Sequence, residues 1–252
     1  MLAEFLELNI FGFLLIFGRL GATISFMPGF SASYVSVRIR VTLALALSFA
    51  VMPAIAPNLP VLPTSVAQLG ILFAGEILVG SFIGILGRVL IGALQTAGTV
   101  IALSSSMANA LIQDPIAEQQ SSTVSGFLLT LGIVIIFVAD FHHLMIRAAM
   151  ETYELFPPGA PLPVGDFAQL MARRVADSFI LGIQLASPAL VIGLTYYIGL
   201  GLLGRLMPQL PVFFFGLPVQ VSLQLWVLTA TVSGIILVFA RRFQEGIGAF
   251  VP

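Results

Sequence analysis

The chain has 252 residues and a net charge of −1, and 59% of its residues are hydrophobic while only 8% are charged. Because an ordinary globular protein carries about a quarter charged residues, this chain has too few of them to cover a water-facing surface. Composition therefore excludes an ordinary soluble domain. The scattered arginines exclude the basic patch of a nucleic-acid binder, and the absence of cysteine excludes disulfide scaffolds and thiol catalysis.

Long apolar runs divide the chain, and a helix of about 20 such residues crosses a bilayer. In chain order the runs cover residues 8–27, 39–55, 66–86, 89–103, 124–147, 176–206 and 212–240. The third and fourth runs meet at Gly87 and Arg88, where the chain forms either one long bent helix or a tight hairpin. The pattern predicts an all-α membrane protein, a single membrane domain over 1–252 with six or seven hydrophobic helices in kinked hairpins.

The positions of the arginines predict how the chain is oriented in a membrane. If the chain crosses seven times, one side of the membrane holds Arg38, Arg40, Arg88, Arg147, Arg173, Arg174, Arg241 and Arg242. Arg205 is the exception. The positive-inside rule then places the N-terminus outside and the C-terminus in the cytoplasm.

Two charged residues lie inside the apolar runs. Arg19 costs about 2.5–3.5 kcal/mol at the centre of a membrane helix, but the Leu, Ile and Phe residues around it offset this cost. Its side chain should therefore face protein and not lipid. Glu76 is the most deeply placed acid.

A stripe of titratable residues begins near the end of the fifth run and continues beyond it at helical steps of three and four. Its members are Asp140, His143, Arg147, Glu151 and Glu154. The stripe is either a salt-bridged face where the helix leaves the apolar zone or a proton relay or metal site, and we favour the first reading. His142 and His143 diverge by about 100° on a helix and cannot easily share a metal ion, so we predict no metal site.

Glu76, Asp140 and Asp177 together form the case for a proton-coupled small-solute transporter. A transporter of repeated halves should show broken helices at matching positions, and the sequence has no such symmetry. A nucleophile elbow, a phosphate-binding Walker loop and a zinc-protease helix are all absent from the sequence. We therefore predict a protein that is not an enzyme and has neither catalytic residues nor a cofactor.

Small residues and prolines predict how the helices pack. Gly80, Gly84 and Gly92 are spaced by four and eight residues and form a smooth face, although glycine is also simply common in membrane helices. Pro188 and Pro218 lie inside apolar runs and should kink their helices. Such kinks are tolerated where neighbouring helices satisfy the freed carbonyls, which indicates a multi-helix assembly.

Residues 104–123 interrupt the apolar pattern with small polar residues. The segment is either an ordinary outside loop or part of a protein-lined water path. In the second case Met107, Leu111 and Ile112 would act as flexible apolar seals, for which the unbranched methionine side chain is well suited.

Four motifs in the same order resemble the FliR/SctT family of type III secretion export-gate subunits. They are Met27-Pro28-Gly29-Phe30 with Val37-Arg38-Ile39-Arg40, then Asp114-Pro115, then Phe141-His142-His143-Leu144 with Tyr153-Glu154-Leu155-Phe156-Pro157, and finally Arg205-Leu206-Met207-Pro208-Gln209-Leu210-Pro211-Val212-Phe213 with Gly216-Leu217-Pro218. The resemblance covers nearly the whole chain.

The resemblance implies a subunit of a flagellar protein export gate in the bacterial inner membrane, at the flagellar basal body. Its partners would be FliP-like and FliQ-like gate subunits, an FlhB-like switch protein and membrane lipids, and its substrates would be unfolded flagellar proteins, with transport energy supplied elsewhere. Residues 1–174 would correspond to a FliP-like part and 175–252 to a FliQ-like helical hairpin. A virulence injectisome subunit is the alternative.

The resemblance also favours the pore-plug reading for residues 104–123, because the family's pore-occluding loop lies at this position. The plug residues would be Met107, Asn109, Leu111, Ile112, Asp114 and Pro115.

Overall fold

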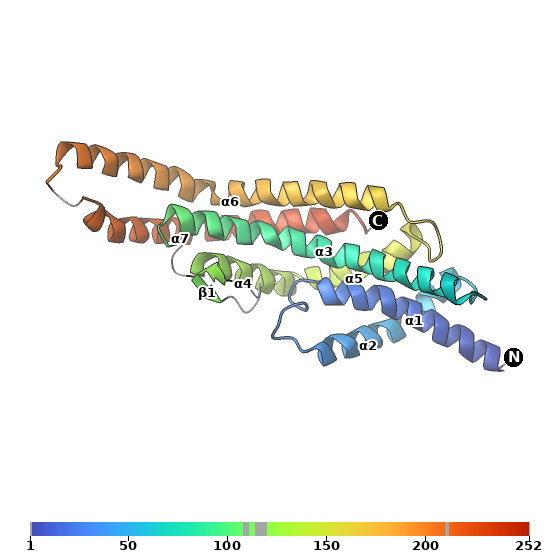
Figure 1. The fold of residues 1–252 in the computed structure, drawn as a ribbon. Helices are drawn as coiled ribbons and strands as arrows, with labels where there is room; N and C mark the ends of the chain where they lie inside the picture. The colour runs from blue at the N-terminus through green and yellow to red at the C-terminus, as the bar shows by residue number, and fades with distance from the viewer. Residues whose placement is uncertain (1, 108–110, 114–119, 210–211, 252) are drawn as a thin grey trace. The chain divides into compact units, whose positions relative to one another are not determined.

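A computed structural model describes residues 2–107, 111–113, 120–209 and 212–251. Three predicted plug residues, Asn109, Asp114 and Pro115, lie outside the described residues. The helices, shown in Figure 1, are α1 (Leu2–Phe26), α2 (Val37–Ile55), α3 (Val66–Ser104), α4 (Thr123–Val138), α5 (Phe141–Leu155), α6 (Val164–Leu206) and α7 (Val212–Gly248). A short 3-10 helix, η1 (Ala56–Asn58), follows α2. The predicted all-α class is confirmed.

Two three-residue strands flank the undescribed middle of the polar segment. Strand β1 (Leu111–Gln113) pairs antiparallel with β2 (Gln120–Ser122), and Leu111 lies opposite Ser122. The segment thus leaves α3 and returns to α4 as a narrow hairpin at its base.

Helix α3 is continuous over 39 residues, which decides between the two arrangements that the sequence allows at Gly87 and Arg88. The sequence of α3 contains no proline, so no backbone donor is lost along it. Gly87 remains helical because its missing side chain leaves room for Met145 of α5. Arg88 is exposed within this helix and does not lie in a loop.

The predicted single run 124–147 is two helices, α4 and α5, with a bend of 69° between them. Asp140 lies between them in the left-handed region, with φ 57° and ψ 21°. Aspartate is one of the few residues with a side chain that tolerates this conformation. The predicted stripe is therefore not one continuing helix, because Asp140 precedes the first helical residue of α5.

Among the described residues, four helices are long and apolar enough to cross a membrane, or five if the bent pair α4–α5 counts as one span. The described apolar part of α1, Ile10–Phe26, is shorter than that requirement. The seven crossings on which the predicted orientation depends are thus reduced, mainly because α3 joins two runs into one helix. These helices agree with a multi-pass membrane protein.

The chain forms two compact units, which we describe separately. Unit 1 contains residues 1–90, 137–174 and 243–252, and unit 2 contains 91–136 and 175–242. One boundary, between residues 174 and 175, lies where the FliQ-like hairpin was predicted to begin. The position of this boundary does not test whether the two parts resemble FliP and FliQ, so that resemblance stays a prediction.

In unit 1, α1 packs closely against α3. Its buried face carries Ile16, Leu20 and Ile24 at steps of four, as expected for a helix with one apolar face. A Cβ at Gly80 would overlap the carbonyl group of Arg19, and one at Gly84 would lie 2.7 Å from the carbonyl oxygen of Thr23. Both glycines therefore lie where the two helix backbones approach each other.

The loop between α1 and α2, which includes the first motif, is fixed by backbone contacts. Gly29 has a φ of 85°, a conformation that glycine adopts without a steric penalty. The guanidinium of Arg40 reaches back to donate to the carbonyls of Ala32, at 3.0 Å, and Val35, at 2.9 Å. Arg40 thus fastens this loop to the start of α2.

In unit 2, α6 and α7 run antiparallel. The amide of Gln224 donates to the carbonyl of Ala189 at 3.0 Å, and the hydroxyl of Tyr196 donates to that of Gly216 at 2.6 Å. The two predicted kink residues, Pro188 and Pro218, lie inside these helices.

Pro188 deprives the carbonyl of Gln184 of its helical donor, and the hydroxyl of Ser187 donates to that carbonyl at 2.7 Å. Gly98, not Gly92, is the tightest α3 glycine in this unit. A Cβ at Gly98 would overlap Ser125 of α4, whereas one at Gly92 would meet only Ser178, at 3.8 Å.

We expect Gly80→Ala to destabilise the protein by about 1–3 kcal/mol, because the added methyl group overpacks the α1–α3 contact. Gly70→Ala in the same helix is the matched control, since nothing lies within 4 Å of a Cβ at Gly70. That change should be neutral or stabilising by up to about 1 kcal/mol through helix propensity. Equal unfolding free energies in detergent for the two variants would contradict the close approach.

Candidate functional site

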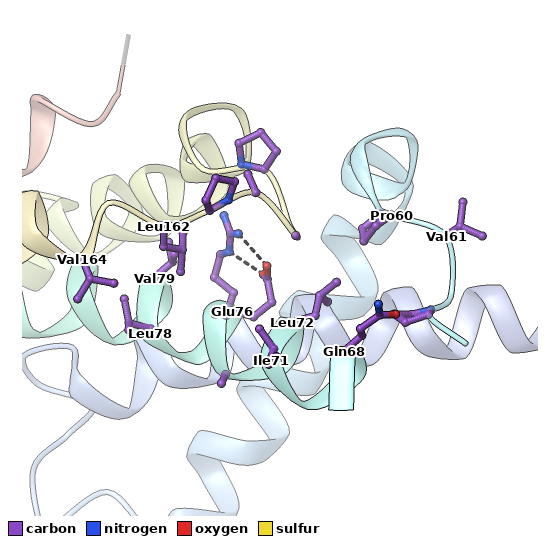
Figure 2. A pocket seen from close by; sticks show the side chains of 18 residues that line it. Pro60, Val61, Gln68, Ile71, Leu72, Glu76, Leu78, Val79, Leu162 and Val164 are labelled. Carbon is purple, nitrogen blue, oxygen red and sulfur yellow. Dashed lines mark hydrogen bonds and ion pairs between the residues drawn. The ribbon is translucent and has the colours of Figure 1, made fainter. Parts of the chain in front are cut away.

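A buried ion pair lies at the centre of unit 1. The guanidinium of Arg19 on α1 donates to Glu76 on α3 through Nε, at 2.8 Å to Oε2, and through Nη2, at 3.0 Å to Oε1. The side chains are only 1% and 2% exposed. Figure 2 shows Glu76 with the two bonds of this bidentate pair marked. Such a planar fork is the strong form of an arginine–carboxylate contact.

Helix α5 supplies the remaining partners of Arg19. Nη1 donates to the hydroxyl of Thr152 at 3.1 Å, and Nη2 donates to the carbonyl of Phe156 at 2.9 Å. The ring of Tyr153 lies beneath the guanidinium, 3.7 Å from ring centroid to Cζ. A cation is also favoured here because the C-terminal end of α5, which carries the partial negative charge of the helix dipole, lies at this point.

This arrangement joins α1 and α3 to the C-terminal end of α5. Thr23, buried one turn after Arg19, donates to the carbonyl of Gly80 at 3.0 Å and adds a further bond between α1 and α3. Glu76 accepts two charge-assisted bonds from Arg19, and its side chain is only 2% exposed.

A cavity of about 790 Å³ opens beside this ion pair. Its walls come from residues 60–63, the first half of α3 and residues 157–164 (Figure 2). Gly159, with a φ of 86°, turns the last of these segments over the cavity. Most of the lining side chains are apolar, so the cavity offers a surface for an apolar group next to a neutralised charge pair.

The three acids of the transporter hypothesis have different surroundings. Glu76 is buried, whereas Asp140 and Asp177 are exposed. Arg147, also from the predicted stripe, is exposed on α5. Sequence reasoning missed Thr152 and, although Tyr153 belongs to a family motif, the contact of its ring with Arg19, because no spacing signal distinguishes these residues from ordinary helix residues.

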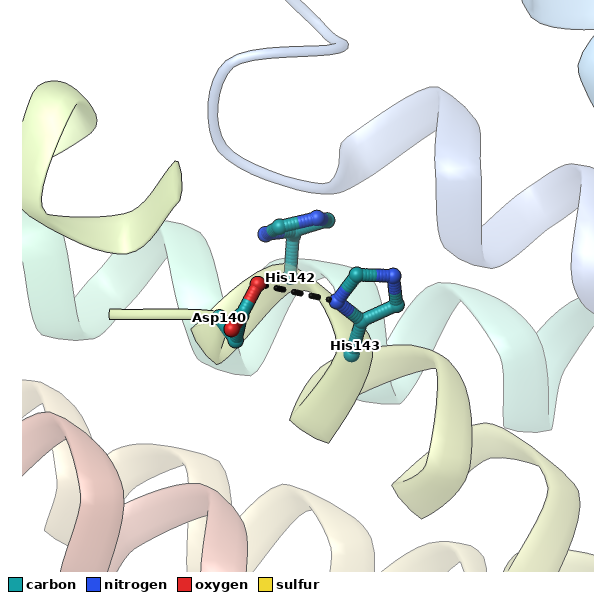
Figure 3. A group of neighbouring side chains, drawn as sticks. All are labelled: Asp140, His142 and His143. Carbon is teal, nitrogen blue, oxygen red and sulfur yellow. Dashed lines mark hydrogen bonds and ion pairs between the residues drawn. The ribbon is translucent and has the colours of Figure 1, made fainter. Parts of the chain in front are cut away.

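Among the described residues, the corner between α4 and α5 gathers three possible metal ligands, although the angle between helical neighbours predicts that the two histidines cannot easily share an ion. The ligand atoms of Asp140, His142 and His143 all lie within 4.8 Å of one another. Figure 3 shows the two imidazoles beside the Asp140 carboxylate. The proximity of these side chains follows from the left-handed backbone of Asp140 and from side-chain reach, neither of which the angle between helical neighbours includes.

In unit 2, the end of α3 fixes the start of the predicted plug segment. The helix ends in a Schellman motif, in which Met107 N donates to Ala102 O at 3.0 Å and Ser106 N donates to Leu103 O at 3.4 Å. Ser106 has a φ of 60°, at the position where this motif usually has glycine.

Side chains of the α6–α7 hairpin hold this strained turn. The amide of Gln220 donates to the carbonyl of Ser104 at 2.8 Å, and the hydroxyls of Ser106 and Tyr197 are 3.1 Å apart. Sequence reasoning missed Gln220 and Gln224, although two glutamines four residues apart in an apolar helix already indicate a buried polar contact.

The far end of the α6–α7 hairpin carries an open apolar groove of about 820 Å³. Its lining includes Leu200, Leu203, Phe215, Val219 and Leu223. An apolar groove of this kind is suited to receive an apolar helix face.

Comparison with known proteins gives this arrangement its context. A family model described as bacterial export proteins, family 1, matches residues 10–246. The chain belongs to this family. The predicted FliR/SctT family is therefore confirmed.

Among its relatives in the bacterial export family is the flagellar biosynthetic protein FliR of Caulobacter vibrioides, which is 35% identical over 236 residues, 94% of either chain. The flagellar biosynthetic protein FliR of Escherichia coli is 27% identical over 214 residues, 84% of this chain and 80% of that one. The Yop proteins translocation protein T of Yersinia pestis is 26% identical over 229 residues, 87% of this chain and 85% of that one.

Proposed function

We propose that this chain is an inner-membrane subunit of a flagellar-type protein export gate, which forms part of the channel for unfolded flagellar proteins and does not catalyse a reaction. The observation that carries the proposal is the family match over residues 10–246, together with relatives named for flagellar biosynthesis. A flagellar system is favoured over a virulence injectisome because identity is 35% to the Caulobacter protein and 26% to the Yersinia protein. Loss of swimming after disruption of the gene would support this choice.

The apolar surface of α6 supports an assembly and not a lone membrane protein. Large exposed apolar side chains recur along the helix from Val175 to Leu206, a distance of about 47 Å at 1.5 Å per residue. The hydrocarbon layer of a bilayer is only about 30 Å thick. Lipid therefore cannot cover the whole stripe, and neighbouring protein must cover the rest.

Helix α7 leads to the same conclusion. It has 37 residues and is thus about 55 Å long. Phe214 is 80% exposed and Trp226 is 79% exposed. We infer that FliP-like and FliQ-like subunits cover these surfaces and that an FlhB-like protein joins the assembled gate.

Residues 104–123 are the proposed plug of the channel. Support comes from their base, where the α6–α7 hairpin fixes the end of α3 through Gln220 and Ser104. The strands β1 and β2 hold the two arms of the segment together. A plug needs such a fixed base, because an untethered polar segment would not stay in a water path.

The proposed orientation keeps the C-terminus in the cytoplasm and the N-terminus outside. In the antiparallel hairpin, Arg173 and Arg174 near the start of α6 and Arg241 and Arg242 near the end of α7 come to the same end. The positive-inside rule places that end in the cytoplasm.

Copurification tests the assembly. A tagged chain, gently solubilised from cells, should bring down companion helical membrane proteins in a fixed ratio. Leu194→Arg on α6, where Leu194 is 65% exposed, should reduce their recovery by about tenfold or more, because a buried unpaired charge costs several kcal/mol.

Leu194→Met is the matched control and should retain the companions, because it conserves volume and apolar character. A wild-type chain that purifies alone and transports a small solute in liposomes would overturn the gate and favour the transporter.

A further inference from the structure

The α4–α5 corner brings together the only two histidines of the chain and an aspartate. Their three ligand atoms lie within 4.8 Å of one another. His143 Nδ1 is 3.2 Å from Asp140 Oδ1, and the two imidazole ring centroids are 4.0 Å apart. Figure 3 shows the three side chains close together, with the contact between Asp140 and His143 marked.

The backbone explains why the three side chains converge. Asp140 lies in the left-handed conformation before α5 begins, so its carboxylate does not follow the helical spacing. It turns instead towards the first turn of α5, which carries both histidines. The ring of Phe137 packs against His142, with centroids 5.0 Å apart, and helps to hold that imidazole in place.

We propose that Asp140, His142 and His143 bind one divalent transition-metal ion, with Zn²⁺ as the best match. Two imidazoles and one carboxylate form a common three-ligand set for zinc, which keeps a further position open for water. With metal–ligand distances of about 2.0–2.2 Å, neighbouring ligand atoms of tetrahedral zinc lie about 3.3–3.5 Å apart. The separation of 3.2 Å between His143 Nδ1 and Asp140 Oδ1 lies close to this range. Mg²⁺ and Ca²⁺ prefer oxygen ligands and fit less well.

Solvent exposure of the site favours the binding of a metal ion, whereas the positive charges near the site oppose it. The side chains of Asp140 and His143 are 75% and 69% exposed, so an ion reaches them without any opening of the fold. The positive dipole end of α5 and the exposed Arg147 one turn further on disfavour a cation. We therefore expect weaker binding than at a closed structural zinc site. A bound ion would link Asp140 to the first turn of α5.

The test uses the full chain in detergent, purified with a tag that contains no histidine. Co²⁺ serves as the probe, because its visible absorption reports nitrogen and oxygen ligation at low coordination number, and Zn²⁺ should displace it. We expect one ion per chain. Asp140→Asn, His142→Ala and His143→Ala should each weaken binding by about tenfold or more, since even the loss of an outer-shell partner costs 10–100-fold.

Glu154→Gln, at an exposed acid on the same helix, is the matched control and should leave binding unchanged. Asp140→Asn keeps a side chain that tolerates the left-handed conformation, so it decides the question if an alanine variant misfolds. Stoichiometry below one ion per chain would overturn the site. So would the Co²⁺ spectrum of the hydrated ion, or equal affinity in the wild type and the three variants.

Discussion

Glu76→Leu is expected to lower the free energy of unfolding by about 3–5 kcal/mol, the usual cost of removing one partner of a buried ion pair. The effect is large because the Arg19 guanidinium would remain buried, at 1% exposure, without its carboxylate. Its bonds to Thr152 and Phe156 would satisfy only part of its donors. Reversible unfolding of the detergent-solubilised protein measures the change.

The double variant Arg19→Met/Glu76→Leu separates the lost pairing from lost packing. Replacing a whole buried pair by apolar residues of similar size is often close to neutral, so the double variant should recover most of the stability. Tyr153→Phe is a control that keeps the ring beneath the guanidinium and should change stability little. A double variant as unstable as Glu76→Leu would show that the pair is not the reason for the loss.

Deletion of residues 107–112 is expected to make the assembled gate leak small ions while the complex still forms. In the proposed plug, Met107, Leu111 and Ile112 close the channel by excluding water, as hydrophobic constrictions do in channels. The deletion leaves Gln220 and its bond to Ser104 intact, so the hairpin that fixes the end of α3 should keep its fold. Conductance of the purified complex in a planar bilayer gives the measurement.

A matched control keeps the three apolar residues and replaces only residues 108–110 by Gly-Ser-Gly. This complex should stay as closed as the wild type, because the apolar side chains that exclude water are retained. Unchanged conductance in the deletion variant would remove the plug assignment. Leakage in the control alone would assign the closure to residues 108–110, which include Asn109, and not to the three apolar residues.

The helical class and the family follow from local and linear features of the chain. Apolar runs with few charges can satisfy their backbone groups only as helices in lipid, and this requirement is independent of which helices become neighbours. The motifs from Met27 to Pro218 occur in family order, which a reading along the chain detects directly. For the same reason the sequence indicates that Arg19 is too costly to face lipid.

Partnership across the chain depends on tertiary structure. Arg19 and Glu76 are 57 residues apart, and no periodicity links them, because their pairing depends on the packing of α1 against α3. Gly80 allows that approach, whereas Gly92, on the same predicted face, has only an ordinary contact. Spacing gives the two glycines equal weight, and only the neighbouring helix distinguishes them.

The sequence also did not determine the backbone conformation at two places. Gly87 and Arg88 could continue a helix or form a turn, and the side chain that packs beside Gly87 in the continuous helix, Met145, belongs to another helix. The run 124–147 is apolar enough for one helix, yet Asp140 breaks it because aspartate tolerates the left-handed conformation that the corner requires. Local composition thus determined that helices form, and the ordered motifs determined the family of the chain. Long-range packing decided where the helices break, which charged side chains pair and which side chains share a site.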